Sequence, residues 1–155
     1  MSYIDLENNK KYKKIHYKDF DGFEEWKEYD DKGNMIHYKD SYDNEEWKEY
    51  DENNNIIHCK DSKGNEYWKE YDDKGNMIHH KNSSGFEYWV KYDDNGIEIY
   101  YIDSDGVECS AECDDNGNVI HYKNPRGDEY WKEYDSNGNE IYYRDSAGNE
   151  CWKEY

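Results

Sequence analysis

Histidines recur along the chain every 21 residues and are the first side chains that could carry chemistry. The five members of this ladder are His16, His37, His58, His79 and His121, and Tyr100 and Tyr142 occupy two equivalent positions. If each repeat contributes two strands, successive histidines lie roughly 10 Å apart. A shared metal needs its nitrogen ligands about 2 Å away. We therefore expect no metal site, and interpret each position as a flat ring packed against tryptophan.

Acidic turns raise the question of calcium. Residues 19–24 and 103–108 read Asp-Phe-Asp-Gly-Phe-Glu and Asp-Ser-Asp-Gly-Val-Glu, which resemble parts of a carboxylate-rich loop. An EF-hand needs a loop of about twelve residues that ends in a bidentate Glu, and neither segment supplies it. Because Asp and Gly are also the residues that turns require, we favour a structural role, with weak calcium binding as the alternative. No cofactor is expected.

The four cysteines are expected to be reduced. Cys59, Cys109, Cys113 and Cys151 stand where other repeats carry Tyr or Glu. On one extended strand Cys109 and Cys113 lie roughly 13 Å apart, beyond the roughly 7 Å between Cα atoms that a disulfide tolerates. Reduced thiols are typical of a cytoplasmic protein, which is the expected location. No nucleophile, base and orienting residue stand together, so we expect no enzyme.

A repeat of 21 residues positions all these side chains. Isoleucine recurs from Ile15 to Ile141, and tryptophan recurs from Trp26 to Trp152 with one interruption at Ser110. We predict a single β-hairpin repeat domain, 1–155, with a degenerate N-terminal cap at 1–14. Its repeats are 15–35, 36–56, 57–77, 78–98, 99–119, 120–140 and 141–155.

Each repeat contains two turn signals separated by strand-like segments. One signal is Asp-Ser-x-Gly, as at 61–64, and the other is Tyr-Asp-x-x-Gly-Asn, as at 134–139. The intervening six or seven residues are rich in Tyr, Trp and Ile, which favours strands. The fold class is therefore all-β: an elongated antiparallel meander of about seven hairpin repeats, in an open twisted or spiral sheet.

Side chains alternate between the two faces of a strand. A repeat with an odd number of residues therefore keeps each position on the same face only if one of its turns has an odd number of residues and the other an even number. We predict a three-residue loop at Asp-Ser-x-Gly-Asn, and a two-residue type I′ turn at Asn95-Gly96, Asn116-Gly117 and Asn137-Gly138. The reverse assignment also satisfies parity, but it places His58 between two lysines. In the chosen register Lys60 faces Glu66, His58 faces Trp68, and Ile57 lies near Tyr71.

That register predicts two different faces. One carries Ile and Tyr, and the other carries Trp, His, Lys and Glu. In the sixth repeat these are, respectively, Ile120, Tyr122, Tyr130 and Tyr134, and Trp131, His121, Lys123 and Glu129. Neither face is purely apolar, which argues against a two-layer sandwich.

Composition narrows the function classes. The chain has 39 acidic and 20 basic side chains, which gives a net charge of −19, so direct nucleic-acid binding is not expected. The 19 tyrosines and 6 tryptophans argue against disorder despite this charge. A helical bundle is nearly excluded, because only one leucine and two alanines are present. No apolar run is long enough to span a membrane, so no membrane partner is expected.

The irregular fifth repeat stands out. No Lys or Arg lies between Lys91 and Lys123, although the stretch contains nine acids. Exposed apolar residues, Ile97 among them, accompany these acids. We predict a docking patch for a basic protein, against plain repeat decay as the alternative. Its residues are Asp93, Asp94, Glu98, Tyr100, Ile102, Asp103, Asp105, Val107, Glu108, Glu112, Asp114 and Asp115.

The Tyr-Asp-x-x-Gly-Asn motif, as at 134–139, resembles the YD repeats of the RHS family. The hairpin-per-repeat layout with Trp and Tyr is also similar to MORN-type repeats. Both resemblances cover the repeats only. They imply a scaffold or shell, with any enzymatic activity in attached domains.

The expected function is a non-enzymatic protein-binding or scaffold module with a rigid acidic, aromatic-rich surface. The first alternative is an acidic mimic of nucleic acid that inhibits a nuclease or another nucleic-acid-binding enzyme, for example in an anti-defence role. The second is a carbohydrate binder that uses the Trp ladder. Edge-to-edge pairing between copies, through the strand ending at Tyr155, is a further expectation.

Overall fold

A computed structural model describes the backbone of residues 2–5 and 10–155 and the side chains from residue 13 onward. Residues 1 and 6–9 of the predicted N-terminal cap lie outside the described residues. The chain divides into two compact units. Unit 1 contains the described residues up to Tyr71 and His80–Gly85, and unit 2 contains Asp72–His79 and Phe86–Tyr155. The single-domain assignment stays a prediction.

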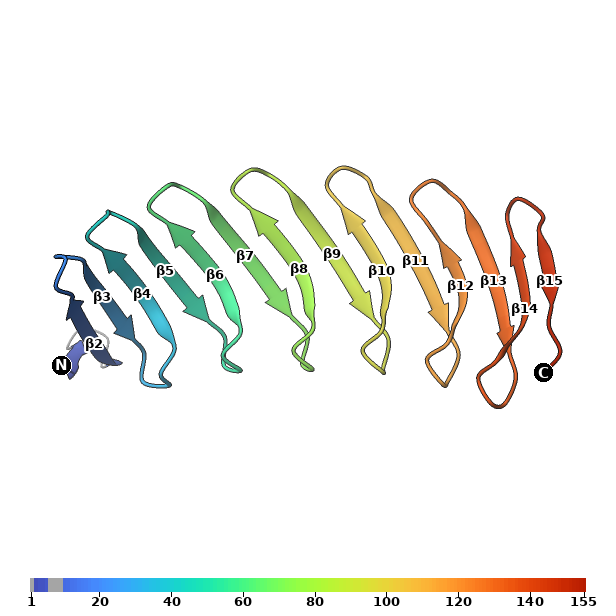
Figure 1. Ribbon diagram of the computed structural model, residues 1–155, viewed down its shortest axis with the longest axis horizontal. Coiled ribbons are helices and arrows are strands. Elements are labelled where there is room, and N and C mark those ends of the chain that lie inside the picture. The colour runs from blue at the N-terminus through green and yellow to red at the C-terminus, as the bar shows by residue number, and fades with distance from the viewer. Residues whose placement is uncertain (1, 6–9) are drawn as a thin grey trace. The chain divides into compact units, whose positions relative to one another are not determined.

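Unit 1 is an antiparallel meander whose strands pair in chain order (Figure 1). Its strands are β1 (Ser2–Asp5), β2 (Lys10–Lys18), β3 (Glu24–Tyr29), β4 (Met35–Asp40), β5 (Glu45–Tyr50), β6 (Ile56–Asp61) and β7 (Glu66–Tyr71). Strand β8 (Met77–Asn82) contributes residues to both units.

Unit 2 repeats the arrangement, with each strand antiparallel to the next along the chain. After the first residues of β8, its strands are β9 (Glu87–Tyr92), β10 (Glu98–Asp103), β11 (Glu108–Cys113), β12 (Val119–Lys123), β13 (Glu129–Tyr134), β14 (Glu140–Asp145) and β15 (Glu150–Trp152). The prediction of an all-β meander of hairpin repeats is confirmed. Among the described residues there is no helix that could cross a membrane.

Both kinds of turn have the same geometry, which corrects one prediction. In the loop after β6, the Asp61 N–H donates to the Asn65 carbonyl at 2.9 Å and Gly64 N–H donates to the Asp61 carbonyl, so three residues form the loop as expected. The loop after β9 uses the same two bonds, from Asp93 N–H to the Ile97 carbonyl and from Gly96 N–H to the Asp93 carbonyl.

The two-residue turns predicted at Asn95-Gly96, Asn116-Gly117 and Asn137-Gly138 are therefore wrong. The preceding Asp supplies the reason. The Asp93 Oδ1 accepts the N–H groups of Asn95 and Ile97, which fixes a loop of three residues. Gly96, at φ 82°, then provides the left-handed residue that closes the loop.

A β-bulge at the repeated isoleucine restores the parity that the second turn does not provide. In unit 1 Tyr50 pairs with Ile56 while Glu49 pairs with His58, so Ile57 is an extra residue without a direct partner. The same shift occurs between β3 and β4, β9 and β10, β11 and β12, and β13 and β14. Because one strand of a bulge carries one extra residue, the repeats that contain these bulges keep the same residues on the same face.

The predicted register is confirmed across β6 and β7. His58 pairs with Trp68 and Lys60 pairs with Glu66, while Cys59 pairs with Tyr67. Hence the Trp and His side chains share one surface, here called the tryptophan face, and alternate positions form the tyrosine face. Tyr122 and Tyr130 pair on the tyrosine face as predicted. The bulged isoleucines are extra residues, so alternation along the strand does not assign them to either face.

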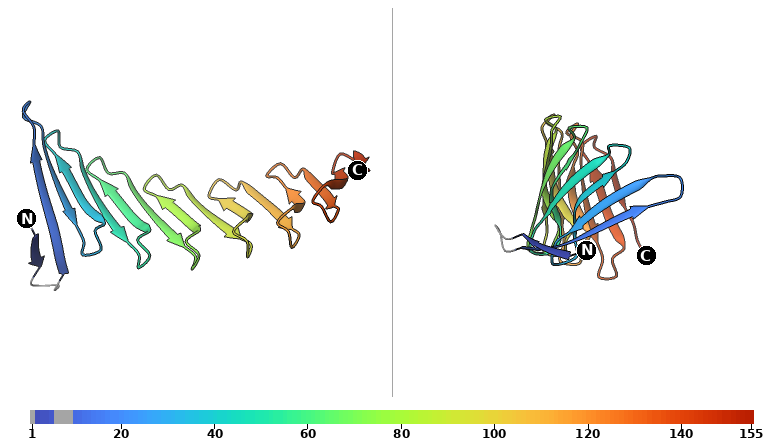
Figure 2. Two further views of the ribbon diagram at one scale, coloured as in Figure 1. Left: turned by 60° about the horizontal axis from the view of Figure 1, so that its bottom comes forward. Right: turned by 90° about the vertical axis from the view of Figure 1, so that its left-hand side faces the viewer.

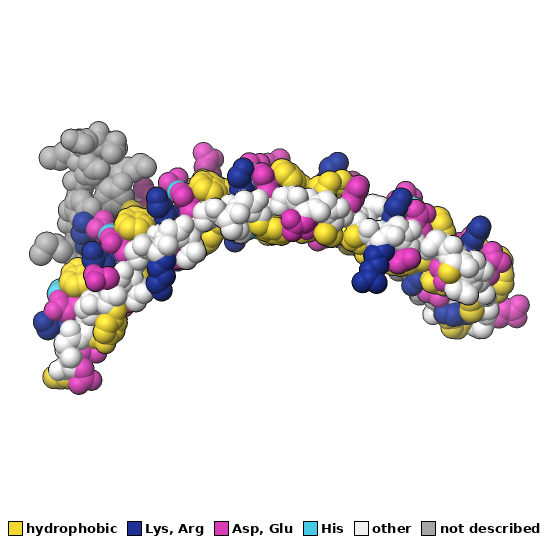
Figure 3. Space-filling view, turned by 90° about the horizontal axis from the view of Figure 1, so that it is seen from above, with side chains coloured by type: hydrophobic (Ala, Val, Ile, Leu, Met, Phe, Trp, Pro, Cys, Tyr) yellow, Lys and Arg dark blue, Asp and Glu magenta, His cyan; other side chains and the backbone are white. Residues whose placement is uncertain are grey.

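Each unit is a single layer of strands, with no second layer drawn over either face (Figure 2). Hydrophobic and charged side chains lie on both sides of the backbone band (Figure 3). The buried apolar residues among those described are Cys59 and Val90, both on the tyrosine face. Stability must therefore come mainly from contacts between neighbouring strands.

A serine in the Asp-Ser-x-Gly turn ties successive hairpins together. The Ser62 N–H donates to the Glu45 carbonyl at 2.8 Å, and the Glu45 N–H donates back to Ser62 Oγ at 3.2 Å. We call this pair of bonds the serine clamp. It recurs at Ser41 with Glu24, Ser83 with Glu66, Ser104 with Glu87, and Ser146 with Glu129.

Candidate functional site

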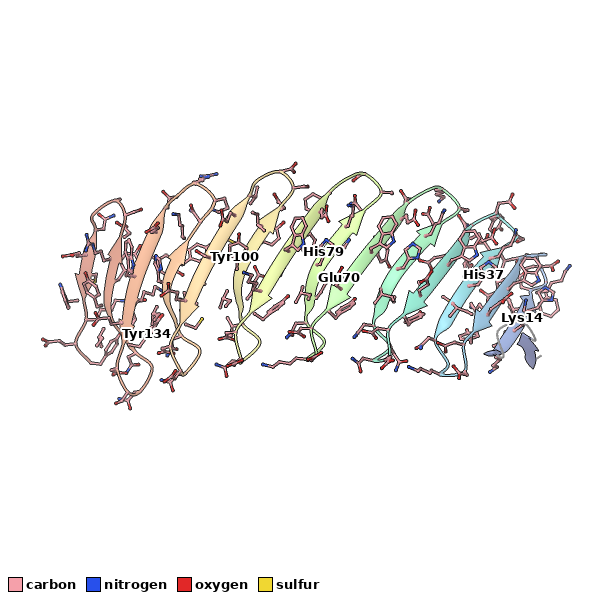
Figure 4. The ribbon with its side chains drawn as sticks, turned by 180° about the vertical axis from the view of Figure 1, so that it is seen from behind. Lys14, His37, Glu70, His79, Tyr100 and Tyr134 are labelled. Atoms are coloured by element: carbon pink, nitrogen blue, oxygen red, sulfur yellow. The ribbon has the colours of Figure 1, made fainter. Side chains whose placement is uncertain are left out.

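The tryptophan face is built from a stacked ring pair in most repeats. Each histidine in the ladder lies parallel to the tryptophan of the following strand, with ring centroids 5.0–5.4 Å apart and planes within 12°. His37 and His79 are labelled in Figure 4. The prediction that these histidines pack against tryptophan is confirmed, and no cluster of metal ligands occurs among the described residues.

A carboxylate lies beside each histidine of the ladder, and two carboxylates flank His58. In unit 1 the His58 Nε2 is 2.8 Å from a Glu66 oxygen, and its Nδ1 is 3.1 Å from a Glu49 oxygen. Burial alone would lower the pKa of His58, but the hydrogen bonds with Glu66 and Glu49 outweigh burial and raise it. Much of the acidity on this face is thus paired within the protein.

A cation completes the repeated arrangement. In the first two repeats Lys18 bonds Glu24, and Lys39 Nζ lies 3.3 Å from Glu45. In later repeats Lys123 lies 3.1 Å from Glu129, and Arg144 Nε lies 3.9 Å from Glu150. Each of these glutamates therefore has a cation from the preceding strand beside it.

The fifth repeat breaks this arrangement at β10 and β11. Tyr100 pairs with Ser110 where other repeats pair a ring with tryptophan, and Ile102 pairs with Glu108 where other repeats provide a cation. Tyr100 is labelled in Figure 4. Lys91 Nζ lies 5.1 Å from the centroid of the Tyr100 ring. Burial and a hydrogen bond to Glu108 raise the pKa of Tyr100.

The structure does not bring all the predicted patch residues together. Tyr100, Ile102, Glu108 and Glu112 share the tryptophan face, as their pairing with Ser110, Trp89 and His121 shows. Glu98 lies on the opposite face, paired with Tyr92.

The other predicted residues lie in turns at the two ends of the strands. Asp93, Asp94, Asp114 and Asp115 lie in the turns after β9 and β11, whereas Asp103 ends β10 and Asp105 and Val107 lie in the turn that follows it. A six-residue strand separates the two ends by roughly 20 Å. The predicted patch is therefore distributed over two faces and two edges.

Several of these carboxylates are already occupied by the backbone. Asp103 is 9% exposed, and its oxygens accept hydrogen bonds from the Asp105 and Val107 N–H groups and from the Tyr101 hydroxyl. Hydrogen bonds from the Asn118 side chain and backbone lower the pKa of Asp114. Asp93, Asp103 and Asp114 thus hold turns, which leaves Asp94, Asp105 and Asp115 as the exposed turn acids.

The turn at 19–22 has the same internal bonding, because Asp19 Oδ1 accepts the Asp21 and Phe23 N–H groups. Backbone hydrogen bonds therefore account for the first Asp, Asp19 and Asp103, of the two segments that resemble calcium loops.

All four cysteines are free thiols. Burial raises the pKa of Cys59 and of Cys109, which keeps them protonated and poor nucleophiles. Cys59 Sγ lies 3.2 Å from a Glu46 oxygen on the tyrosine face.

Sequence reasoning left two relevant positions out of the predicted patch. Ser110 interrupts the tryptophan ladder, and Pro125 replaces the serine that would clamp Glu108. Aligning the chain at its 21-residue period shows both departures. Their importance depends on pairings between neighbouring hairpins, which only the structure displays.

Comparison with known proteins supports the fold. No protein-family model matches the chain, and no curated protein matches it. Similar solved structures include the crystal structure of TcdB2-TccC3-Cdc42, with 15% identity and a TM-score of 0.56 over 86% of this chain and 8% of that chain. That of TcdB2-TccC3-TEV has 14% identity and the same TM-score over 90% of this chain and 9% of that one.

These neighbours are Tc toxins that carry RHS/YD repeats, and this chain spans less than a tenth of them. At such low identity the likeness shows the fold alone: a meander of β-hairpin repeats. It agrees with the resemblance to YD repeats at the level of architecture.

Proposed function

We propose that this chain is a non-enzymatic repeat module that binds a protein with a basic surface. The observation that carries the proposal is the repeated tryptophan face. Its tryptophans remain partly exposed, with Trp47 at 41% and Trp89 at 42%, although a histidine stacks on each indole. Aromatic rings held rigidly beside carboxylates supply the contact area and the polar groups that protein interfaces use.

The repeat architecture makes this face suitable for binding. Stacked rings, flanking ion pairs and serine clamps fix each hairpin against the next, so little conformational entropy is lost when a partner binds. The likeness to the RHS-repeat region of a toxin agrees with a scaffold role.

Two alternatives have less support. A nucleic-acid mimic needs free carboxylates at regular spacing, but the regular turn aspartates direct their oxygens to backbone N–H groups, as Asp61 does with Lys63 and Asn65. A carbohydrate binder needs open indole faces, but histidine covers one face of the tryptophan in five repeats.

The test captures binding proteins on the immobilised chain and identifies them by mass spectrometry. We compare the wild type with Glu108→Lys/Glu112→Lys on the tryptophan face and with Asp94→Lys/Asp115→Lys in the turns. Both double variants change the net charge equally. The proposal predicts that only the first variant loses the captured protein, and that binding persists from about 0.05 M to 0.5 M salt.

The mimic gives the opposite pattern. Binding would collapse with salt, and both double variants would weaken it alike, because the attraction would depend on total charge. Unchanged capture by the Glu108→Lys/Glu112→Lys variant would exclude the tryptophan face of the fifth repeat as the binding surface.

A further inference from the structure

Glu108 has lost the cation that its counterparts keep. Glu45 and Glu129 each have a lysine amine within 3.3 Å, donated by the preceding strand. The residue paired with Glu108 is Ile102, whose side chain has no charge. Among the described residues no ion pair of Glu108 occurs, and its side chain is exposed. A negative charge therefore remains available on this part of the tryptophan face.

Glu108 also lacks the serine clamp. Seventeen residues further along the chain, the position that holds serine in five other repeats is Pro125. Proline has no N–H to donate and no hydroxyl to accept a hydrogen bond. Hence Glu108 lacks both clamp bonds that Glu87 makes, in which the Ser104 N–H donates to the Glu87 carbonyl and the Glu87 N–H donates to Ser104 Oγ.

The third loss leaves a slot in the ring ladder. Ser110 lies between Tyr100 on β10 and Lys123 on β12, and both are its direct cross-strand partners. In the next repeat the equivalent residue is Trp131, which lies between His121 at 5.0 Å and Arg144 at 5.8 Å. Serine is far smaller than an indole, so no ring among the described residues packs on the side of Tyr100 towards β11.

We propose that this slot at Ser110 receives an aromatic side chain, preferably tryptophan, from a partner protein that carries basic residues beside it. The inference rests on the proposed function and identifies the chemistry that the partner supplies. The partner ring lies between Tyr100 and the aliphatic part of Lys123, and the adjacent cations bind Glu108 and Glu112. The partner thus replaces the ring and the cation that the fifth repeat lacks.

The protein itself shows that such a ring fits. Tyr142 is the equivalent of Tyr100 in the last repeat, and its ring centroid lies 4.3 Å from that of Trp152, with the planes tilted by 40°. The Tyr142 hydroxyl donates to Glu150 at 3.2 Å, and Glu108 is the equivalent of Glu150 in the fifth repeat. A tyrosine at this position therefore packs against an indole without disturbing its bond to the glutamate.

Charge favours a basic partner segment. Lys123 is engaged with Glu129 at 3.1 Å, and Lys91 lies over the other side of the Tyr100 ring. Glu112 is 73% exposed, and the nearest ion-pair partner shown for it is His121, at 3.7 Å. Glu108 and Glu112 are thus the carboxylates at the slot that an incoming cation can reach.

The test is an NMR titration with the capped tripeptide Lys-Trp-Lys, with Lys-Ala-Lys at equal charge as the control. We expect the amide signals of Tyr100, Ser110 and Lys123 to shift and saturate with Lys-Trp-Lys only. Ser110→Trp fills the slot with the residue of the other repeats and should weaken binding about tenfold or more, whereas Ser110→Ala keeps the slot open and should bind like the wild type.

A second pair of variants separates the slot from general electrostatics. Ile102→Lys and Ala111→Lys each add one positive charge and each restore the lysine of other repeats, but on opposite faces. The proposal predicts several-fold weaker binding for Ile102→Lys and little change for Ala111→Lys. This pair gives a decision even if Ser110→Trp fails to fold, which the spectrum itself would reveal.

If the two lysine variants weaken binding of Lys-Trp-Lys equally, the slot proposal is overturned. NMR shifts spread evenly over the signals of all the tryptophans would overturn it as well. These failures are distinguishable from failure of the proposed function. If the slot fails while Glu108→Lys/Glu112→Lys still abolishes capture of a protein, the module binds its partner by another contact on the same face.

Discussion

Deleting Ile57 tests whether the bulge maintains the faces of the sheet. Tyr50 pairs with Ile56 and Glu49 pairs with His58, so removing the residue between them joins two pairs that already exist. The three-residue loop before it, which Asp51 and Asn55 close, is unaffected. His58 should therefore still stack on Trp68 in the deletion variant.

The expected cost is small. Ile57 is only partly buried, so its loss should lower the free energy of unfolding by about 1 kcal/mol, about half the value for full burial of an isoleucine. Urea denaturation monitored by tryptophan fluorescence measures the change. An NMR pH titration of His58 should show that its raised pKa persists, since Glu49 and Glu66 still flank it.

Deleting Cys59 provides the matched control. This deletion also shortens β6 by one residue, but it can be absorbed only by moving His58 to the tyrosine face. The stack on Trp68 and the paired carboxylates are then lost, along with the buried Cys59 side chain, at an expected cost above about 3 kcal/mol. If the two deletions destabilise the protein equally, the bulge does not maintain the register.

Three further predictions concern the turns. Acidification should destabilise the protein below about pH 4, because hydrogen bonds from Asn65 lower the pKa of Asp61 in the folded state. The stability that this carboxylate contributes is present above the unfolded pKa and is lost as pH falls through the folded pKa. Urea midpoints at pH 6 and pH 3 measure the loss. Gly64→Ala should lower the free energy of unfolding by about 1–2 kcal/mol, because φ at this position is +88°, although the added Cβ would meet nothing within 4 Å. Gly64→Asn should cost less, since Asn54 has a positive φ at the same place in the preceding turn. Thermal denaturation compares the two variants. Pro125→Ser should restore a serine clamp and slow hydrogen exchange at the Glu108 amide; an unchanged exchange rate would contradict the account of the missing clamp.

The sequence was sufficient to predict the strands and the cross-strand pairs between β6 and β7. The period fixed which rings and charges recur, and pairing opposite charges chose the register in which Lys60 meets Glu66. The turn type was beyond this reasoning, because Asn-Gly also favours a two-residue turn. The decisive contribution, two backbone bonds to Asp93, depends on the loop conformation that they stabilise.

The role of the isoleucine could not be predicted either. Some β-bulges are marked by a glycine, but a bulge at an isoleucine has no such marker, so Ile57 cannot be distinguished in the sequence from any other strand residue. The serine clamp joins Ser62 and Glu45, which are 17 residues apart and meet only once neighbouring hairpins lie side by side. For the same reason the predicted patch was contiguous in sequence but is divided in space: its members alternate between faces and end in opposite turns.

The departures in the fifth repeat differ according to face, which argues against simple decay of the repeat. On the tyrosine face, Ala111 and Cys113 replace a lysine and a tyrosine with smaller apolar side chains, both partly buried. On the tryptophan face, by contrast, Ile102 and, in the sixth repeat, Pro125 remove the cation and the serine clamp of Glu108, and Ser110 removes the ring beside Tyr100. Ile102 and Pro125 thus occupy the two positions that bond this glutamate in other repeats, and Ser110 follows Glu108 by two residues on the same face. The cation and the ring that the other repeats provide for themselves are missing here, and a partner protein can supply both. For this reason we assign binding to the fifth repeat rather than to its regular neighbours.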